Sequence, residues 1–433
     1  MVEKSLAEAV KRNVLPITSR CNVRCRFCSH TGNPAEVTVV SFPHVPLAKI
    51  TQFIPFLDPE KKIVIGESAT VINEGEPLLH PEFKTIILEI RKLYPETPIA
   101  VTTNGLLLNP EMIDFLASQG RVELVVSVNA LTPAKRKLIF GYESDILKNL
   151  EYLSKKLPFT ASFVFMPQII GYPEYVASIK KLIALGVEAV RVFLPGYTAK
   201  NKSLMNVPPA LEKLAQKLFV EFLAENTPII IEPVLLKDFK SEVLGVAPGG
   251  AANFLRKKDI ILKINGKKPF SRIEAHKLLN TPGSKTLEIM RQGKIISFNF
   301  SLNPGTAAGV FFYRDIEEET LWQIINKIEN NKASSPLILT SPLALLLLKS
   351  GLKKLGKKYP VYPVKSRFFG GNIRCAGLLT VGDYVYALKQ AWEFFQPDYL
   401  LLPGISFDDR GRDLTGKSYL EIAEFFKIKT EIL

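Results

Sequence analysis

The feature that most constrains the fold of this chain is a regular alternation of short β-branched apolar runs with amphipathic stretches, from about residue 13 to residue 193. β-Branched runs favour strands, and apolar residues three to four positions apart favour helices. Their alternation predicts βα units around a parallel sheet, an α/β fold. We predict strands at residues 14–18, 61–65, 99–103, 122–128, 162–166 and 189–194, with helices such as 83–94 and 175–185 between them.

Three of the four cysteines follow the first predicted strand, as Cys21, Cys25 and Cys28 in a C-x3-C-x2-C run. A loop of this length can wrap one iron–sulfur cubane and give one thiolate to each of three irons. Ferredoxin-type clusters use four cysteines and leave no iron open. The spacing therefore predicts a 4Fe-4S cluster whose fourth iron is free for another ligand.

Two other uses of these cysteines stay open on spacing alone. A zinc ion could take the three thiolates together with His30 or His80, although structural zinc sites usually show paired C-x2-C or H-x3-H halves. A disulfide framework is less favoured, because 433 residues supply ample material for a core and no secretory signal is recognised.

The cysteine run, with Phe27 directly before its last cysteine, resembles the signature of the radical S-adenosylmethionine (SAM) superfamily. The resemblance implies a partial (β/α)6 barrel with the cluster loop after the first strand. It also implies that SAM chelates the open iron through its amino and carboxylate groups. An electron from the cluster then cleaves SAM and releases a 5′-deoxyadenosyl radical.

Motifs at successive strand ends extend this resemblance. Residues 74–77 (E-G-E-P) resemble the family's G-G-E-P motif, with Glu74 in place of the first glycine, and residues 102–105 (T-T-N-G) resemble the molybdenum-cofactor cyclase branch. Ser127 and Asn129 stand where relatives carry a Ser-x-Asp that meets the SAM ribose, and strand alternation places both on one face. The SAM-binding residues implied are Phe27, Gly75, Glu76, Thr103, Asn104, Ser127, Asn129 and Arg136, the last as a partner for the SAM carboxylate.

Cys375 is the one cysteine outside this run, so a second all-cysteine cluster within this chain is excluded. It lies in a largely apolar stretch, residues 372–378, where a free cysteine is usually a small buried hydrophobe. The sharper alternative is a catalytic Cys375, which donates a hydrogen atom or forms a covalent link to quench a substrate radical.

The helix–strand rhythm changes near residue 228, and we predict three domains: a radical SAM domain at 1–230, a second domain at 231–301 and a third at 302–433. The second resembles a PDZ domain, which implies either peptide binding or a purely architectural module. The third is predicted to be a C-terminal α/β domain and resembles an uncharacterised domain that accompanies radical SAM and PDZ-like modules. Its Gly370 and Gly371 suit either an anionic ligand or tight turns.

The net charge of +14 bears on partners and not on the fold. Lysines and arginines are spread along helices and turns without interleaved aromatic residues, so we expect solvated faces and no nucleic-acid partner. The family resemblance implies an acidic electron donor, flavodoxin or ferredoxin, which a basic surface attracts. The longest apolar stretch, residues 336–348, is too short to span a bilayer, so we expect no membrane segment and a cytoplasmic location.

Three hypotheses of function follow. We predict a radical SAM enzyme that modifies a peptide or protein, because of the PDZ-like module. The cyclase-like motifs instead favour an enzyme of cofactor or small-metabolite biosynthesis. A non-enzymatic binding or scaffold protein is the third alternative.

Overall fold

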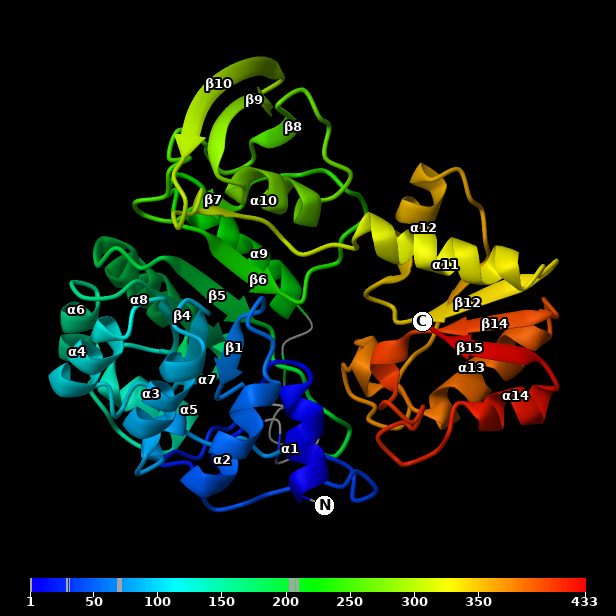
Figure 1. Ribbon diagram of the computed structural model, residues 1–433, viewed down its shortest axis with the longest axis horizontal. Coiled ribbons are helices and arrows are strands. Elements are labelled where there is room, and N and C mark those ends of the chain that lie inside the picture. Colours follow the sequence, from blue (N-terminus) through cyan, green and yellow to red (C-terminus); the bar gives the residue numbers. More distant parts are fainter. Residues whose placement is uncertain (1, 29, 31, 68–71, 202–206, 208–209) are drawn as a thin grey trace.

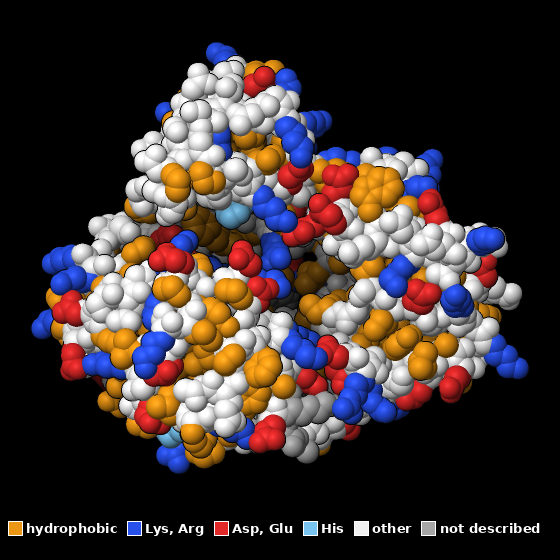
Figure 2. Space-filling model, in the orientation of Figure 1, with side chains coloured by type: hydrophobic (Ala, Val, Ile, Leu, Met, Phe, Trp, Pro, Cys, Tyr) orange, Lys and Arg blue, Asp and Glu red, His pale blue; other side chains and the backbone are white. Residues whose placement is uncertain are grey.

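The computed structural model describes the chain apart from residues 1, 29, 31, 68–71, 202–206 and 208–209. It has three lobes, which follow one another along the sequence (Figure 1). The N-terminal lobe holds a parallel sheet with its helices, a small β-rich lobe lies above it, and a second α/β lobe lies beside both. Figure 2 shows that the surface is hollowed where the three lobes meet.

The N-terminal lobe is built on a six-stranded sheet in the order β1-β2-β3-β4-β5-β6, and every neighbouring pair is parallel. The strands are β1 (Ile63–Ile65), β2 (Ile99–Thr103), β3 (Val122–Ser127), β4 (Phe159–Val164), β5 (Ala189–Phe193) and β6 (Ile229–Glu232). The predicted parallel sheet of six strands is confirmed. Its strands are mostly buried on both sides, as expected for a sheet covered by helices.

The prediction is wrong about which six segments form the sheet. Residues 14–18 make only isolated bridges, Val14 to Val64 and Thr18 to His44, because Pro16 in their middle has no N–H for a ladder. The sixth strand is instead β6, which runs across the boundary predicted at residue 230. That division into domains stays a prediction.

Helices cover this sheet and pack their apolar faces on one large core. They are α1 (Val2–Val10), α2 (Leu47–Phe53), α3 (Phe83–Leu93), α4 (Pro110–Ser118), α5 (Pro133–Phe140), α6 (Leu147–Leu153), α7 (Pro167–Ile170), α8 (Tyr172–Ala184) and α9 (Leu211–Glu221). Several begin with proline in the first turn, where its missing N–H costs nothing. The loops that follow β2, β3 and β4 are short, whereas those after β1 and β5 are longer. Because the sheet is parallel, these loops lie at one edge of it.

The small lobe has its own core and an antiparallel sheet in the order β10-β9-β8. Its elements are β7 (Gly245–Val246), β8 (Ile260–Ile264), α10 (Arg272–Asn280), β9 (Gly283–Arg291), β10 (Lys294–Leu302) and β11 (Val310–Phe311), which pairs with β7. Ser271 caps α10 by accepting from Glu274 N at 3.0 Å. The likeness of this lobe to a PDZ domain stays a prediction.

The C-terminal lobe has a parallel four-stranded sheet in the order β13-β12-β14-β15. Its elements are α11 (Glu318–Asn330), β12 (Pro336–Thr340), α12 (Leu345–Lys354), β13 (Val361–Pro363), α13 (Val381–Trp392), β14 (Tyr399–Leu402), α14 (Leu420–Phe426) and β15 (Lys429–Ile432). One core lies between the sheet and α11 and α12, and another contains residues of α13 and α14. Among the described helices of the chain, none has the length and apolar content needed to cross a membrane.

Candidate active site

Cys21, Cys25 and Cys28 line one cavity of about 600 Å³ at the loop edge of the six-stranded sheet. Their loop is held against the end of α5, since Arg24 N donates to Phe140 O at 2.8 Å and Arg26 N to Ile139 O at 3.0 Å. Phe27 packs edge-on against Phe140, with ring centroids 6.3 Å apart, and both rings line the cavity. The cysteine loop is therefore anchored by backbone bonds beside an aromatic wall.

The donor set fits a cluster better than a single zinc ion. In the described part of the chain, no three His, Cys, Asp or Glu side chains are placed to hold one metal ion. His80 is buried, and both ring nitrogens are used, by Val45 O at 2.9 Å and Glu82 N at 3.1 Å. Three thiolates around one cavity suit a cubane, which takes each on a different iron. Burial raises the pKa of the Cys25 thiol to about 12, so binding iron releases a proton there.

Gly75 lies against the start of the cysteine loop. A Cβ at this position would be 2.0 Å from Arg20 O, so only glycine fits. Gly75 N donates to Thr18 O and Glu76 N to Arg20 O, both at 2.8 Å. The glycine of the E-G-E-P motif thus lets the loop after β1 pack directly on the cysteine loop.

Glu76 joins the loops after β1 and β2 instead of projecting freely into the cavity. Its carboxylate accepts from Thr103 Oγ1 and Asn104 N, both at 2.7 Å, and from Leu78 N at 3.2 Å. The side chain is buried, and burial raises its pKa to about 7 despite these three donors. Asn104 in turn donates to Asn22 Oδ1 at 2.6 Å, next to Cys21.

Arg136 is corrected from an expected ligand of SAM to a structural residue. It is fully buried and is not among the cavity-lining residues. Its guanidinium donates to Val128 O, to Asn104 O at 3.2 Å and to Ser144 Oγ at 2.9 Å, and stacks on Phe140. Burial lowers its pKa to about 10. Its donors brace the ends of β2 and β3, which leaves no exposed group for a carboxylate.

The expectation that Ser127 and Asn129 share one face is also wrong. Ser127 lines the cavity, but Asn129 has a φ of 56°, outside strand geometry, and its side chain turns toward β4. Its Oδ1 accepts from Val164 N at 2.6 Å, and 1% of the residue is exposed. The six predicted residues brought together at the cavity besides the cysteines are Phe27, Gly75, Glu76, Thr103, Asn104 and Ser127.

The C-terminal lobe supplies part of the wall of the same cavity, through Phe369, Ile373, Cys375 and Leu378. Cys375 is exposed. The buried position that is usual for a free cysteine in an apolar stretch is therefore not found here. Burial of part of its surface still raises the pKa of its thiol. One cavity therefore contains all four cysteines of the chain, three from the N-terminal lobe and one from the C-terminal lobe.

Asn372 and two glycines attach this wall to the loop after β5. Asn372 Nδ2 donates to Pro195 O at 2.9 Å, and its Oδ1 accepts from Tyr197 N at 2.8 Å. Gly371 has a φ of 60°, and a Cβ there would be 2.0 Å from Tyr197 O. Gly370 and Gly371 thus form a tight turn that packs closely on the N-terminal lobe. Of the two roles considered for them, an anion site or a tight turn, this is the tight turn.

Several residues of the cavity wall were not predicted as site residues, and two parts of it are prominent. Glu74 lines the cavity, and burial raises the pKa of its carboxyl to about 8; the sequence signal was its departure from the glycine of the motif. The loop from Phe193 to Gly196 also lines it, without a local motif that could have indicated this.

Comparison with known proteins finds relatives of the part of the chain that carries Cys21, Cys25 and Cys28. Residues 15–182 match the profile of the Radical SAM superfamily. A GTP 3′,8-cyclase of Aquifex aeolicus is 31% identical over 171 residues, which cover 37% of this chain and 48% of that protein. A tungsten-containing aldehyde ferredoxin oxidoreductase cofactor-modifying protein of Pyrococcus furiosus is 29% identical over 128 residues, covering 30% and 33%.

Among solved structures, SuiB of Streptococcus suis bound to its precursor peptide SuiA aligns with a TM-score of 0.41 at 16% identity, covering 51% of this chain and 48% of that one. The chain spans about half the length or less of the curated relatives it matches. The matched part of the chain is a radical SAM superfamily domain, the domain of enzymes of the radical SAM type. These enzymes use a 4Fe-4S cluster and SAM, and they need an electron donor.

Proposed function

We propose that this protein is a radical SAM enzyme that modifies a peptide or protein substrate lying between the N-terminal and C-terminal lobes. When bound, the cluster and SAM supply an electron transfer that yields a 5′-deoxyadenosyl radical, which takes a hydrogen atom from the substrate. Cys21, Cys25 and Cys28 would hold three irons. Phe27, Gly75, Glu76, Thr103, Asn104 and Ser127 would shape the SAM site, with Glu76 keeping two strand-end loops in register.

The observation that carries the substrate class is the shape of the space beyond the cysteines. A cavity of about 480 Å³ shares Leu194, Ile373 and Cys375 with the cysteine-lined cavity. A further cavity of about 390 Å³ shares Glu212 and Arg374 with the second one. The three cavities therefore adjoin one after another where the lobes meet. A row of connected cavities suits a substrate in an extended conformation, such as a peptide.

The charges of the site support an uncharged reacting group. Among the described residues, the cysteine-lined cavity has no lysine or arginine in its wall, although the chain carries 56 of them. A polyphosphate is normally bound by several such cations. Arg374 lies in the next cavity, and it is already paired with Glu212 at 2.5 Å. This favours a side chain or backbone of a peptide over a nucleotide such as GTP.

Cys375 is proposed as the hydrogen-atom donor that completes the reaction. Its S–H bond would break and a C–H bond would form on the substrate radical. The resulting thiyl radical would then take one electron from the reduced electron donor and one proton from solvent. Its exposure, and its place in the wall of the cavity that the cluster cysteines also line, support this role.

The electron donor is proposed to be acidic, as flavodoxins and ferredoxins are. Arg20, Arg24 and Arg26 alternate with the cluster cysteines and are exposed. In the part of the chain that the structure describes, none of them forms an ion pair. Unpaired cations next to the cluster loop would attract an acidic partner and shorten the distance for electron transfer.

Cofactor or metabolite biosynthesis is the second candidate, favoured by the GTP 3′,8-cyclases among the relatives. A binding or scaffold role without catalysis is the third. The PDZ-like module would contribute to peptide binding under the first proposal. In that module, both ends of helix α10 contact the segment that follows β10. Asn280 Oδ1 accepts a hydrogen bond from Ala308 N at 2.9 Å, and Asp315 Oδ2 accepts one from Arg272 N at 2.8 Å.

The test is anaerobic reconstitution with iron and sulfide, reduction with dithionite, and measurement of 5′-deoxyadenosine in the presence of SAM. Cell extract should stimulate its formation, and extract digested with proteinase K and then freed of the protease should not. GTP and phosphatase-treated extract serve as comparison arms. Stimulation by GTP alone would favour the second candidate, and absence of 5′-deoxyadenosine in every arm would contradict both enzyme proposals.

A further inference from the structure

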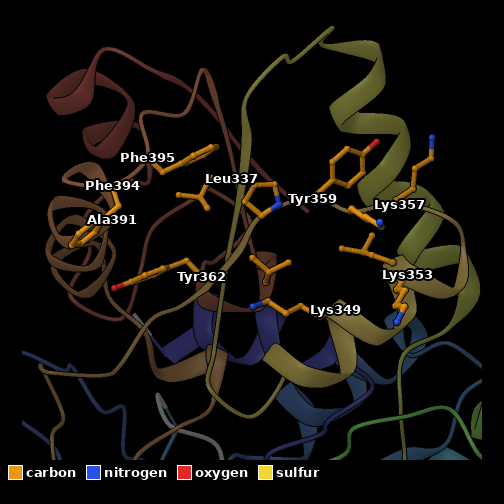
Figure 3. A pocket seen from close by; sticks show the side chains of 13 residues that line it. Leu337, Lys349, Lys353, Lys357, Tyr359, Tyr362, Ala391, Phe394 and Phe395 are labelled. Atoms are coloured by element: carbon orange, nitrogen blue, oxygen red, sulfur yellow. The ribbon is translucent and has the colours of Figure 1, made fainter.

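The C-terminal lobe carries a separate groove of about 750 Å³, which the proposed reaction does not use. It lies along β13, the edge strand of the four-stranded sheet, between α12 and α13 (Figure 3). Its floor is apolar and includes Leu337, Leu352, Val361 and Ala391, all at most 7% exposed. We call this cavity the edge groove. Its volume is in the range of ordinary ligand sites.

The two sides of the edge groove differ in chemistry. Lys349 and Lys353 lie one helical turn apart on α12, and Lys357 and Lys358 follow in the loop to β13. The opposite side is formed by the end of α13 and by Phe394 and Phe395 (Figure 3). Phe394 is 88% exposed, which is unusual for a phenylalanine on a free surface. A ligand for the edge groove must therefore be apolar on one side and anionic on the other.

Most of these lysines are available for a ligand. Lys357 is paired with Glu329. Within the described residues, Lys349, Lys353 and Lys358 have no acidic side chain within ion-pair distance. Three unpaired cations on one side of an apolar groove favour an acidic ligand by charge complementarity.

The backbone under the edge groove favours a peptide. Ile338 N donates to Pro360 O at 3.0 Å and Val364 N donates to Thr340 O at 2.7 Å, so alternate residues of β13 face β12. The N–H and C=O of Val361 therefore point away from the sheet, toward its open edge. Pro360 and Pro363 flank Val361 and limit further strand addition, because proline offers no donor. One main-chain donor and acceptor remain, which match one peptide unit.

We propose that the edge groove binds a short acidic segment of a partner protein, with one aromatic or aliphatic side chain on the apolar floor. Its carboxylates would lie on Lys349, Lys353 and Lys358, and its backbone would pair with Val361. A nucleic acid is the less suitable ligand. Among described residues the groove wall has no arginine, whose forked guanidinium matches phosphate, and the outward groups of Val361 have no counterpart in a sugar–phosphate backbone.

Fluorescence anisotropy of the full-length protein tests this proposal. The probe is a fluorescein-labelled, amidated peptide Glu-Phe-Glu-Leu-Glu-Phe-Glu. The comparison probes are the same peptide with every Glu replaced by Lys, called the all-lysine peptide, and a labelled ten-nucleotide oligo(dT). The variant Lys349→Glu/Lys353→Glu reverses two charges on the exposed face of α12. The control Lys148→Glu/Lys180→Glu makes the same charge change on exposed residues of α6 and α8. Phe394→Ser removes the exposed ring without disturbing a core.

We expect saturable binding of the acidic peptide, weakened about ten-fold or more by the α12 variant and measurably by Phe394→Ser, and unchanged in the control. The all-lysine peptide should not bind. Absence of saturable binding at 1 mM peptide (about the weakest affinity of interest), or equal losses in the control variant, would overturn the proposal. Oligo(dT) binding that is lost in the α12 variant, without peptide binding, would instead assign the groove to nucleic acid.

Discussion

Asn372 of the C-terminal lobe forms a closed pair of hydrogen bonds with Tyr197 of the N-terminal lobe. Its Oδ1 accepts from Tyr197 N at 2.8 Å, and its own N donates to Tyr197 O at 3.1 Å. The backbone and the side chain of Asn372 together thus bind both backbone groups of Tyr197, and they join two segments that are far apart in the sequence. Because Cys375 follows three residues later, this contact fixes where its thiol lies in the cavity.

Replacing Asn372 should loosen the contact between the two lobes. Asn372→Ala removes two side-chain hydrogen bonds, worth about 1 kcal/mol each. Amide hydrogen exchange of residues 194–199 should then be faster by about ten-fold or more. Asn299→Ala, at an exposed position of β10, should leave that exchange unchanged.

Gly371→Ala should produce the same faster exchange by a different cause, since its Cβ would clash with Tyr197 O. Gly382→Ala is the matched control, because a Cβ there meets its nearest atom at an ordinary 3.7 Å. If Asn372→Ala and Gly371→Ala both exchange like the wild type, the lobes are not held together by this contact.

Glu76→Gln should destabilise the apo protein by about 2 to 4 kcal/mol. The buried carboxylate accepts three hydrogen bonds, and the amide of glutamine would turn a donor toward one of the N–H or O–H groups. Urea unfolding followed by circular dichroism measures the change. The exposed Glu82→Gln should stay within about 0.5 kcal/mol of the wild type, and an equally small effect for Glu76→Gln would show that its three bonds do not hold the strand-end loops.

Glu74 should make the apo protein less stable as pH rises. Burial raises the pKa of its carboxyl from the ordinary 4.5 to about 8, so the folded state binds more protons than the unfolded state between these values. Stability from the neutral carboxyl is therefore complete below pH 4.5 and is lost as pH rises toward 8 and above. Glu74→Gln should be more stable than the wild type by about 1 to 3 kcal/mol at pH 9 and nearly equal to it at pH 5.

Unfolding of the two proteins at several pH values measures this difference. Glu76 also titrates in this range, with a pKa raised to about 7, but it is present in both proteins and cancels in the comparison. A difference in stability that does not change between pH 5 and pH 9 would contradict a buried neutral Glu74.

Cys375→Ala should separate cleavage of SAM from completion of the reaction. The variant keeps Cys21, Cys25 and Cys28, so its iron content and its 5′-deoxyadenosine formation should match the wild type. The yield of modified product is measured by mass spectrometry, with the cell extract that stimulates 5′-deoxyadenosine formation as the source of substrate. This yield should fall about 100-fold or more, as expected for loss of a group that transfers hydrogen. Full product formation would remove Cys375 from the reaction.

Charge reversal at Arg24 and Arg26 should slow reduction by a protein donor and not by a small reductant. Arg24→Glu/Arg26→Glu should lower the rate with reduced flavodoxin about ten-fold at low salt, and the loss should shrink at high salt because of screening. The rate with dithionite should stay the same. Equal losses with both reductants would indicate damage to the cysteine loop, not loss of a docking surface.

The parts of the site that the sequence could predict are those whose residues are neighbours in the chain. Cys21, Cys25 and Cys28 share one loop, so their spacing alone predicts that they line one site. Strand β2 was predicted with its observed bounds, since an apolar β-branched run marks it directly.

The errors concern side chains whose direction is set by partners far away in the sequence. Asn129 continues a strand pattern, but its positive φ turns its amide to Val164. Arg136 lies on a basic helix face that looks solvated, yet it is buried by carbonyls of two strand ends. The position of Cys375 depends on how the lobes dock through Asn372, and no local pattern indicates that.

The most direct test of the account is the EPR spectrum of the anaerobically reconstituted, dithionite-reduced protein, recorded with and without SAM. The account predicts a signal of a reduced 4Fe-4S cluster that is absent in the Cys21→Ala/Cys25→Ala/Cys28→Ala variant and that changes when SAM binds to the open iron. Cys375→Ala should show the same change. A reduced cluster whose spectrum is unaffected by SAM, or a protein that binds zinc and no iron at these cysteines, would contradict it.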